Sequence, residues 1–60
     1  MKYTEFHRFV KRNGWQEVRS TGGHIFYEKE GHPRCIPVPF HKGEIPEPLR
    51  LRIMKEMGLK

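Results

Sequence analysis

The sequence predicts an α+β fold in the order helix, three-stranded antiparallel sheet, helix, with both helices on one face of the sheet. Apolar residues recur at helical spacing near each end of the 60-residue chain, and short runs of strand-forming residues lie between them. Stretches rich in glycine and proline separate these runs, so each strand can fold back on the one before it. A chain of this length makes one domain, which we expect to span residues 1–60.

The first helix is expected over about residues 4–12. Phe6 and Val10 lie one helical turn apart on an apolar stripe, and the Thr4 hydroxyl can cap the helix N-terminus. Asn13-Gly14 follows the last basic residues and is a typical stop signal. These features predict a short amphipathic helix with one buried face.

Three runs of strand formers follow this helix. They are WQEVRS at 15–20, HIFYEKE at 24–30 and RCIPVPF at 34–40. Pro37 and Pro39 alternate in the third run and have no N–H to donate. The third strand is therefore expected at an edge of the sheet, paired on one side only.

The last helix is expected within residues 46–60. Glu47 and Pro48 are favourable in a first helical turn, and Gly58 is a natural residue for the helix end. The residues of its apolar stripe recur every four positions: Leu49, Ile53 and Met57.

The chain is basic, with 12 Lys and Arg residues against 7 Asp and Glu residues and a formal net charge of +5. A sequence pI near 9.8 satisfies the first requirement for a nucleic-acid-binding domain. Many small proteins are also basic simply for solubility. Charge alone therefore favours nucleic-acid binding and this simpler explanation about equally.

Several classes of protein are disfavoured by composition. Cys35 is the only cysteine, so the chain forms no internal disulfide and suits a reducing compartment. No apolar run reaches the length of about 18 residues that a membrane span needs. The first ten residues mix charged and apolar side chains, unlike a signal peptide. We therefore expect a soluble cytoplasmic protein.

The stretch TGGH, residues 21–24, is the main candidate for a functional site. Two adjacent glycines indicate either a simple hairpin turn or a place where another molecule approaches the backbone closely. His24 follows them, and an imidazole titrates near neutral pH. It can accept a proton from a ribose 2′-hydroxyl or donate one to a leaving 5′-oxygen, which is the chemistry of metal-free RNA cleavage. A structural role for a histidine at a strand start remains the simpler alternative.

The other histidines carry weaker signals. His41 lies beside Lys42 in the loop before the last helix, as a second catalytic candidate or as a residue that orders the turn. His32 is expected on the surface of a hairpin, and His7 on the polar side of the first helix with no special role. The spacing of His32, Cys35 and His41 does not follow the paired pattern of zinc ligands, so we expect no metal and no other cofactor.

Three pieces of the sequence, in the right order, resemble the HicA family of bacterial toxins. The first helix leads through NGW into EVRS, GGHIFY resembles the family's Gly-Ser-His and strand, and IPVPFHKGEIPEPLRLRIMKEMGL resembles its last strand and helix. Together these pieces cover nearly the whole chain.

The resemblance implies a fold like that of double-stranded-RNA-binding domains and metal-independent cleavage of mRNA, which arrests translation. His24 matches the family's active-site histidine, and Gly22 and Gly23 match the two residues before it, although the family usually has Ser at the second. His41 matches the histidine after the third strand. The implied partners are mRNA and a HicB antitoxin that covers the active site.

A set of RNA-binding residues follows from this resemblance and from the need for cations near a phosphate. It comprises Arg19, Gly22, Gly23, His41 and Lys42.

The alternative functions are a non-catalytic RNA-binding module of the same fold and an adaptor whose basic face meets an acidic protein. The sequence places no second histidine beside His24.

Overall fold

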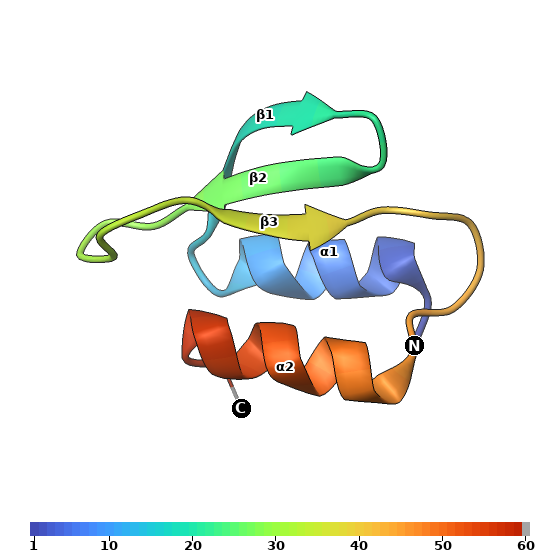
Figure 1. Cartoon of the computed structure of the whole chain (residues 1–60). Helices are drawn as coiled ribbons and strands as arrows, with labels where there is room; N and C mark the ends of the chain where they lie inside the picture. The colour runs from blue at the N-terminus through green and yellow to red at the C-terminus, as the bar shows by residue number, and fades with distance from the viewer. Residues whose placement is uncertain (60) are drawn as a thin grey trace.

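The computed structural model of the chain describes residues 1–59 and has the predicted order of elements. The elements are α1 (Tyr3–Arg12), β1 (Gln16–Thr21), β2 (His24–Glu28), β3 (Ile36–Pro39) and α2 (Glu47–Met57). Strand β2 is central and pairs antiparallel with β1 and β3. Both helices lie on the same face of the sheet (Figure 1), so the predicted α+β architecture is confirmed.

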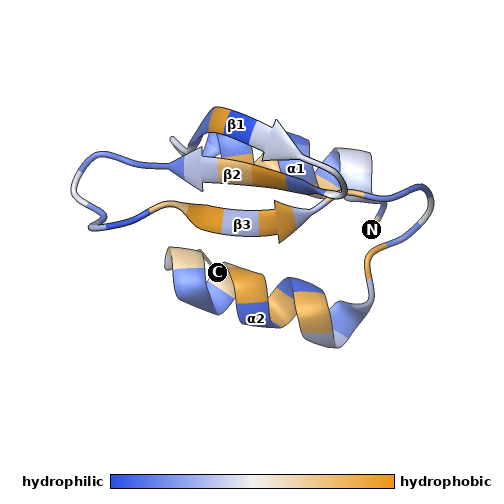
Figure 2. Ribbon diagram, turned by 45° about the horizontal axis from the view of Figure 1, so that its top comes forward, coloured by the Kyte–Doolittle hydropathy of each residue, from blue (hydrophilic) through white to orange (hydrophobic). Residues whose placement is uncertain are grey.

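The core lies between the helices and the inner face of the sheet. Phe6 and Val10 of α1 are fully buried, as are Tyr27 of β2 and Val38 of β3. The last helix adds Ile53 and other apolar residues to the same cluster, and Figure 2 shows hydrophobic segments along β2, β3 and α2. Burying these side chains is the main favourable term for a chain with so little interior.

The two outer strands differ in their relation to the core. Every residue of β1 is exposed, and the pairing of β1 with β2 shifts between Glu17 and Arg19 at a bulge. Strand β3 pairs only with β2 and carries Pro37 and Pro39. The prediction that the proline-containing strand is an edge strand is confirmed. Within residues 1–59, no helix is long and apolar enough to cross a membrane.

The start of α1 differs from the prediction that Thr4 caps the helix. The helix begins at Tyr3, whose backbone N–H donates to the Gly43 carbonyl at 3.1 Å. The Lys2 backbone N–H donates to the Glu5 carboxylate at 2.8 Å. Because the loop before α2 and the Glu5 side chain satisfy these donors, the helix starts one residue earlier without a hydroxyl cap. The other helix ends as predicted, with Gly58 in the left-handed region at φ +72°.

His7 corrects a second prediction, which placed it on the polar side of α1 with no special role. Its side chain is only 5% exposed. His7 lies four residues after Tyr3 and three before Val10, both buried, so it belongs to the core-facing stripe. Its Nε2–H donates to the Pro39 carbonyl at 2.9 Å, because a carbonyl can only accept, and its Nδ1 therefore accepts from the Tyr27 hydroxyl.

Burial shifts the ionisation of both partners toward their neutral forms. Desolvation lowers the pKa of His7 below its usual value, aided by Lys11 and opposed by the Pro39 carbonyl and Glu17. Burial, with a smaller contribution from Glu17, raises the pKa of Tyr27 to about 12. At neutral pH the pair is therefore an uncharged hydrogen-bonded bridge between α1 and the sheet.

This bridge predicts a pH dependence of stability. Below pH 6.5, the ordinary pKa of histidine, the unfolded chain protonates His7 before the folded chain does, so the free energy of unfolding falls as the pH falls. The double variant His7→Leu/Tyr27→Phe removes this titration and replaces both partners with apolar groups. Urea unfolding between pH 7.5 and pH 5.5 is expected to show a steeper loss of stability for the wild type. Parallel curves for the two proteins would contradict the assignment.

Candidate functional site

The Gly22-Gly23 turn connects β1 to β2, with Thr21 and His24 paired on either side of it. Gly23 has φ +86°, a backbone conformation that glycine adopts without steric cost. Gly22 has no positive φ, and a Cβ atom added there would meet nothing within 4 Å. The turn therefore favours glycine at its second position, where a side chain would be strained, and leaves open space at its first.

The two glycines are expected to respond differently to replacement by serine. Gly23→Ser forces a side chain into the left-handed region and is expected to lower stability by about 1 kcal/mol, a fall in Tm of about 4–8 °C for so small a domain. Gly22→Ser meets neither strain nor a neighbour, so its Tm should change by much less. Thermal unfolding of the two variants checks this. Equal shifts in Tm would show that backbone strain is not the reason for glycine at position 23.

His24 is exposed and begins β2, and the direction of its side chain follows from the strand. Tyr27 is in the core and Ile25 packs against it, so their side chains face the helices. Successive side chains of a strand point to opposite faces, which places His24 and Phe26 on the face that no helix covers. The imidazole is therefore accessible to a ligand from the open side of the sheet.

Arg19 lies on the same open face as His24. It is opposite Phe26 in the β1–β2 register, and its guanidinium carbon is 4.6 Å from the centre of the Phe26 ring. His24 is the diagonal neighbour of Arg19, and such neighbours are about 7–8 Å apart, within reach of long side chains. The structure thus places a cation on the same face of the sheet as the imidazole, as expected for a site that binds a phosphate.

His41 lies at the same end of the sheet as the glycine turn. The Phe40 backbone N–H donates to the Gly23 carbonyl at 2.9 Å and continues the pairing beyond β3. The His41 Cε1 atom consequently lies 3.6 Å from where a Cβ atom of residue 23 would be. The His41 ring also meets the Tyr3 ring edge-on, at 5.5 Å between centroids. A second imidazole therefore stands beside the turn that precedes His24.

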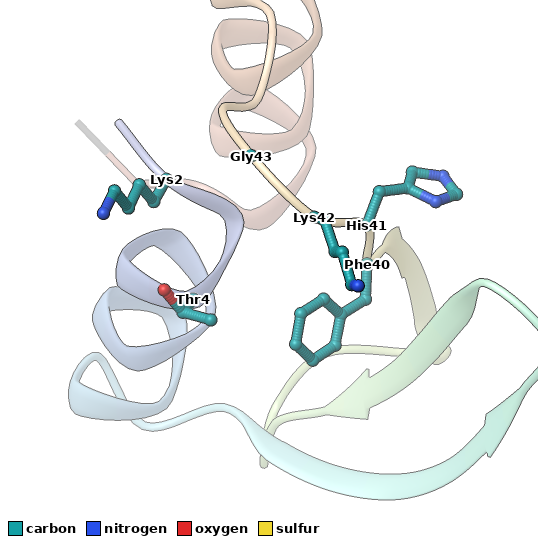
Figure 3. A pocket seen from close by; sticks show the side chains of 6 residues that line it. All are labelled: Lys2, Thr4, Phe40, His41, Lys42 and Gly43. Carbon is teal, nitrogen blue, oxygen red and sulfur yellow. The ribbon is translucent and has the colours of Figure 1, made fainter.

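Beyond His41, a hollow of about 710 Å³ opens between the start of α1 and the loop that follows β3 (Figure 3). It is lined by Lys2, Thr4, Phe40, His41, Lys42 and Gly43. His41 and Lys42 were predicted as RNA-binding residues from the sequence, whereas Lys2 and Phe40 were not. Lys2 reaches the site because the N-terminal segment bridges Glu44 in the loop, a long-range contact without a local sequence signal.

The remaining histidine and the cysteine lie in another part of the molecule. His32 donates from Nδ1 to the Arg34 carbonyl at 2.9 Å and packs against Trp15, with 5.0 Å between ring centroids. Cys35 is a free, exposed thiol. In the part of the chain that the structure describes, no three His, Cys, Asp or Glu side chains gather in a way that could hold a metal ion.

Comparisons with known proteins cover the whole described chain. Residues 3–59 match a family model described as the HicA toxin of bacterial toxin-antitoxin. The chain is also 37% identical, over 60 residues, to a protein of Pseudomonas fluorescens (strain Pf0-1) named "Probable mRNA interferase HicA". That alignment spans 100% of this chain and 98% of the relative.

Proposed function

Because this chain belongs to the HicA family of toxins from bacterial toxin–antitoxin systems, we propose that it cleaves mRNA and thereby arrests translation in the cytoplasm. The observation that carries the proposal is the exposed imidazole of His24, which begins β2 after the open Gly22-Gly23 turn. The relative's printed name, an mRNA interferase, supports the same activity.

The proposed reaction uses the hydroxyl group of the RNA itself as the nucleophile. His24 accepts the proton of a ribose 2′-hydroxyl, and the 2′-oxygen forms a bond to the adjacent phosphorus. The bond from phosphorus to the 5′-oxygen breaks, and that oxygen takes a proton from a second group. His41 is our candidate for this donor, because its ring lies beside the turn that precedes His24. The products are a 2′,3′-cyclic phosphate and a 5′-hydroxyl, without a metal or other cofactor.

The surroundings of His24 support binding and charge stabilisation. Arg19 lies on the same open face, held by its stacking on Phe26, and would face the negative charge that develops on the phosphate. The open space at Gly22 admits a phosphodiester close to the backbone. Lys42 extends the cationic surface beyond the turn.

We further propose that the protein partner is a HicB antitoxin that covers His24 and the basic surface around it. A toxin with an exposed active site must be blocked in the cell that makes it. A partner that binds only the folded toxin also stabilises it by mass action, which matters for so small a domain.

The direct test incubates the purified protein with RNA in the presence of EDTA. Shortening of the RNA supports a metal-independent ribonuclease. RNA that is bound in a salt-dependent way but stays intact would instead support a non-catalytic binding module. RNA that is neither bound nor cut would favour an adaptor that contacts only protein.

A further inference from the structure

Phe40 is an aromatic side chain held in place on one side and exposed on the other. The centroid of its ring lies 4.9 Å from the centroid of the His7 ring, and the angle between the two ring planes is 31°. His7 is itself fixed by hydrogen bonds to Tyr27 and to the Pro39 carbonyl. Phe40 nevertheless remains 40% exposed. The core thus supports a ring that keeps a large part of its surface open.

The exposed part of Phe40 borders the hollow of about 710 Å³ described above. Figure 3 shows its ring projecting toward α1, with Thr4 on the far side and Lys42 extending beside it. Lys2 also lines the hollow, with its ammonium group extending away from the Phe40 ring, and none of the described residues that line the hollow is acidic. Its volume falls in the range of about 300–1,000 Å³ that is usual for small-molecule pockets.

Phe40 also borders the neighbouring hollow that contains the His24 turn. That smaller hollow, of about 290 Å³, is lined in part by Thr21, Gly23 and His24, and unlike the larger one it has an acidic residue, Glu17, in its lining. Phe40 is common to both hollows, so a chain molecule bound to His24 on the open face reaches the larger hollow by passing around the end of the sheet at the glycine turn.

We propose that the larger hollow is a nucleobase subsite, in which one base of a single-stranded RNA stacks on Phe40 while Lys42 binds a flanking phosphate. This inference rests on the proposed function and adds to it the position of a nucleotide near the scissile bond. An aromatic ring beside cations is the usual platform for unpaired bases, and stacking tolerates any base because each has a π face. The subsite therefore selects unpaired RNA rather than a particular sequence.

Binding measurements with two probes of equal charge test the subsite. One probe is a 2′-O-methyl hexauridine, which lacks the nucleophile and cannot be cut; the other is the same sugar-phosphate chain without bases. Phe40→Leu keeps an apolar contact for His7 but removes the π face, and it is expected to weaken hexauridine binding about tenfold. It should leave binding of the abasic chain unchanged, and Phe40→Tyr should behave like the wild type.

Lys42→Ala provides the matched control, because loss of a phosphate contact should weaken both probes to a similar extent. Thermal unfolding of the Phe40 variants checks that they remain folded. Equal binding of both probes by the wild type would overturn the subsite, as would a Phe40→Leu variant that keeps full hexauridine affinity. A Phe40→Leu variant that binds both probes normally and loses only its affinity for the antitoxin would overturn the subsite and assign Phe40 to a protein contact.

Cleavage of ordinary RNA, measured in parallel, separates this inference from the proposed function. If the wild type cuts RNA but does not distinguish the two probes, the subsite is wrong and the ribonuclease stands. If base-dependent binding through Phe40 is found without any cleavage, the subsite stands and the ribonuclease is wrong.

Discussion

Replacing His24 with alanine is expected to slow RNA cleavage by about 10²–10⁴-fold, the usual contribution of a general acid or base. The reason is chemical, since the variant has no group at this position to accept the proton of the 2′-hydroxyl. The side chain is exposed at the first residue of β2, so its removal should leave the fold and the thermal unfolding midpoint nearly unchanged. The rate is measured on one defined RNA with both proteins at equal concentration.

His32→Ala is the matched control for this prediction. His32 lies in the other hairpin of the sheet, bonded to the Arg34 carbonyl and packed on Trp15, away from the glycine turn. We expect this variant to cleave RNA at close to the wild-type rate. A His24→Ala protein that is folded and as active as the wild type would remove His24 from the mechanism.

Replacing Phe6 with alanine is expected to remove a large part of the protein's free energy of unfolding at 25 °C. Phe6 has no exposed surface and lies in the core cluster between α1 and the sheet. Truncation of a buried phenylalanine costs about 3–5 kcal/mol. The whole free energy of unfolding of a chain this long is about 3–9 kcal/mol. Far-ultraviolet circular dichroism and urea unfolding would measure the loss.

Leu51→Ala provides the comparison on α2. Leu51 is 51% exposed, so its truncation leaves no cavity and is expected to change stability by at most about 0.5 kcal/mol. If Phe6→Ala were as mild as Leu51→Ala, the core would not lie where the structure places it.

The elements of the fold could be predicted because each is encoded locally. The four-residue repeat of Ile53 and Met57 defines the buried side of α2, and both are in the core. Pro37 and Pro39 exclude pairing on the second side of β3, which the structure confirms. The order of these local patterns along the chain was enough to give the α+β class.

The surroundings of the site depend on pairing between distant segments, which no local pattern encodes. The pairing of Gly23 with Phe40 brings His41 to the glycine turn, and the contact between Lys2 and Glu44 completes the adjacent hollow. Strand alternation left the direction of His24 open, because Phe26 and its neighbours are apolar on both faces of β2. Only the burial of Tyr27 settles which face is covered.

His7 was mispredicted for a different reason. Its spacing from Tyr3 and Val10 places it on the buried stripe of α1. Hydropathy scales class histidine as polar, however, so a hydropathy pattern assigns it to the exposed side. What makes its burial favourable is the pair of partners, Tyr27 and the Pro39 carbonyl, that reach it from two strands. Partners 20 and 32 residues away in the sequence cannot be read from a helical repeat.

The central claim is that His24 activates the 2′-hydroxyl of the RNA, and the chemistry of the cut ends tests it most directly. RNA fragments produced by the purified protein in EDTA are analysed by mass spectrometry. The proposed mechanism predicts a 2′,3′-cyclic phosphate on one side of the cut and a 5′-hydroxyl on the other. Fragments that carry a 3′-hydroxyl and a 5′-phosphate would contradict it, because water rather than the ribose would then have attacked the phosphorus.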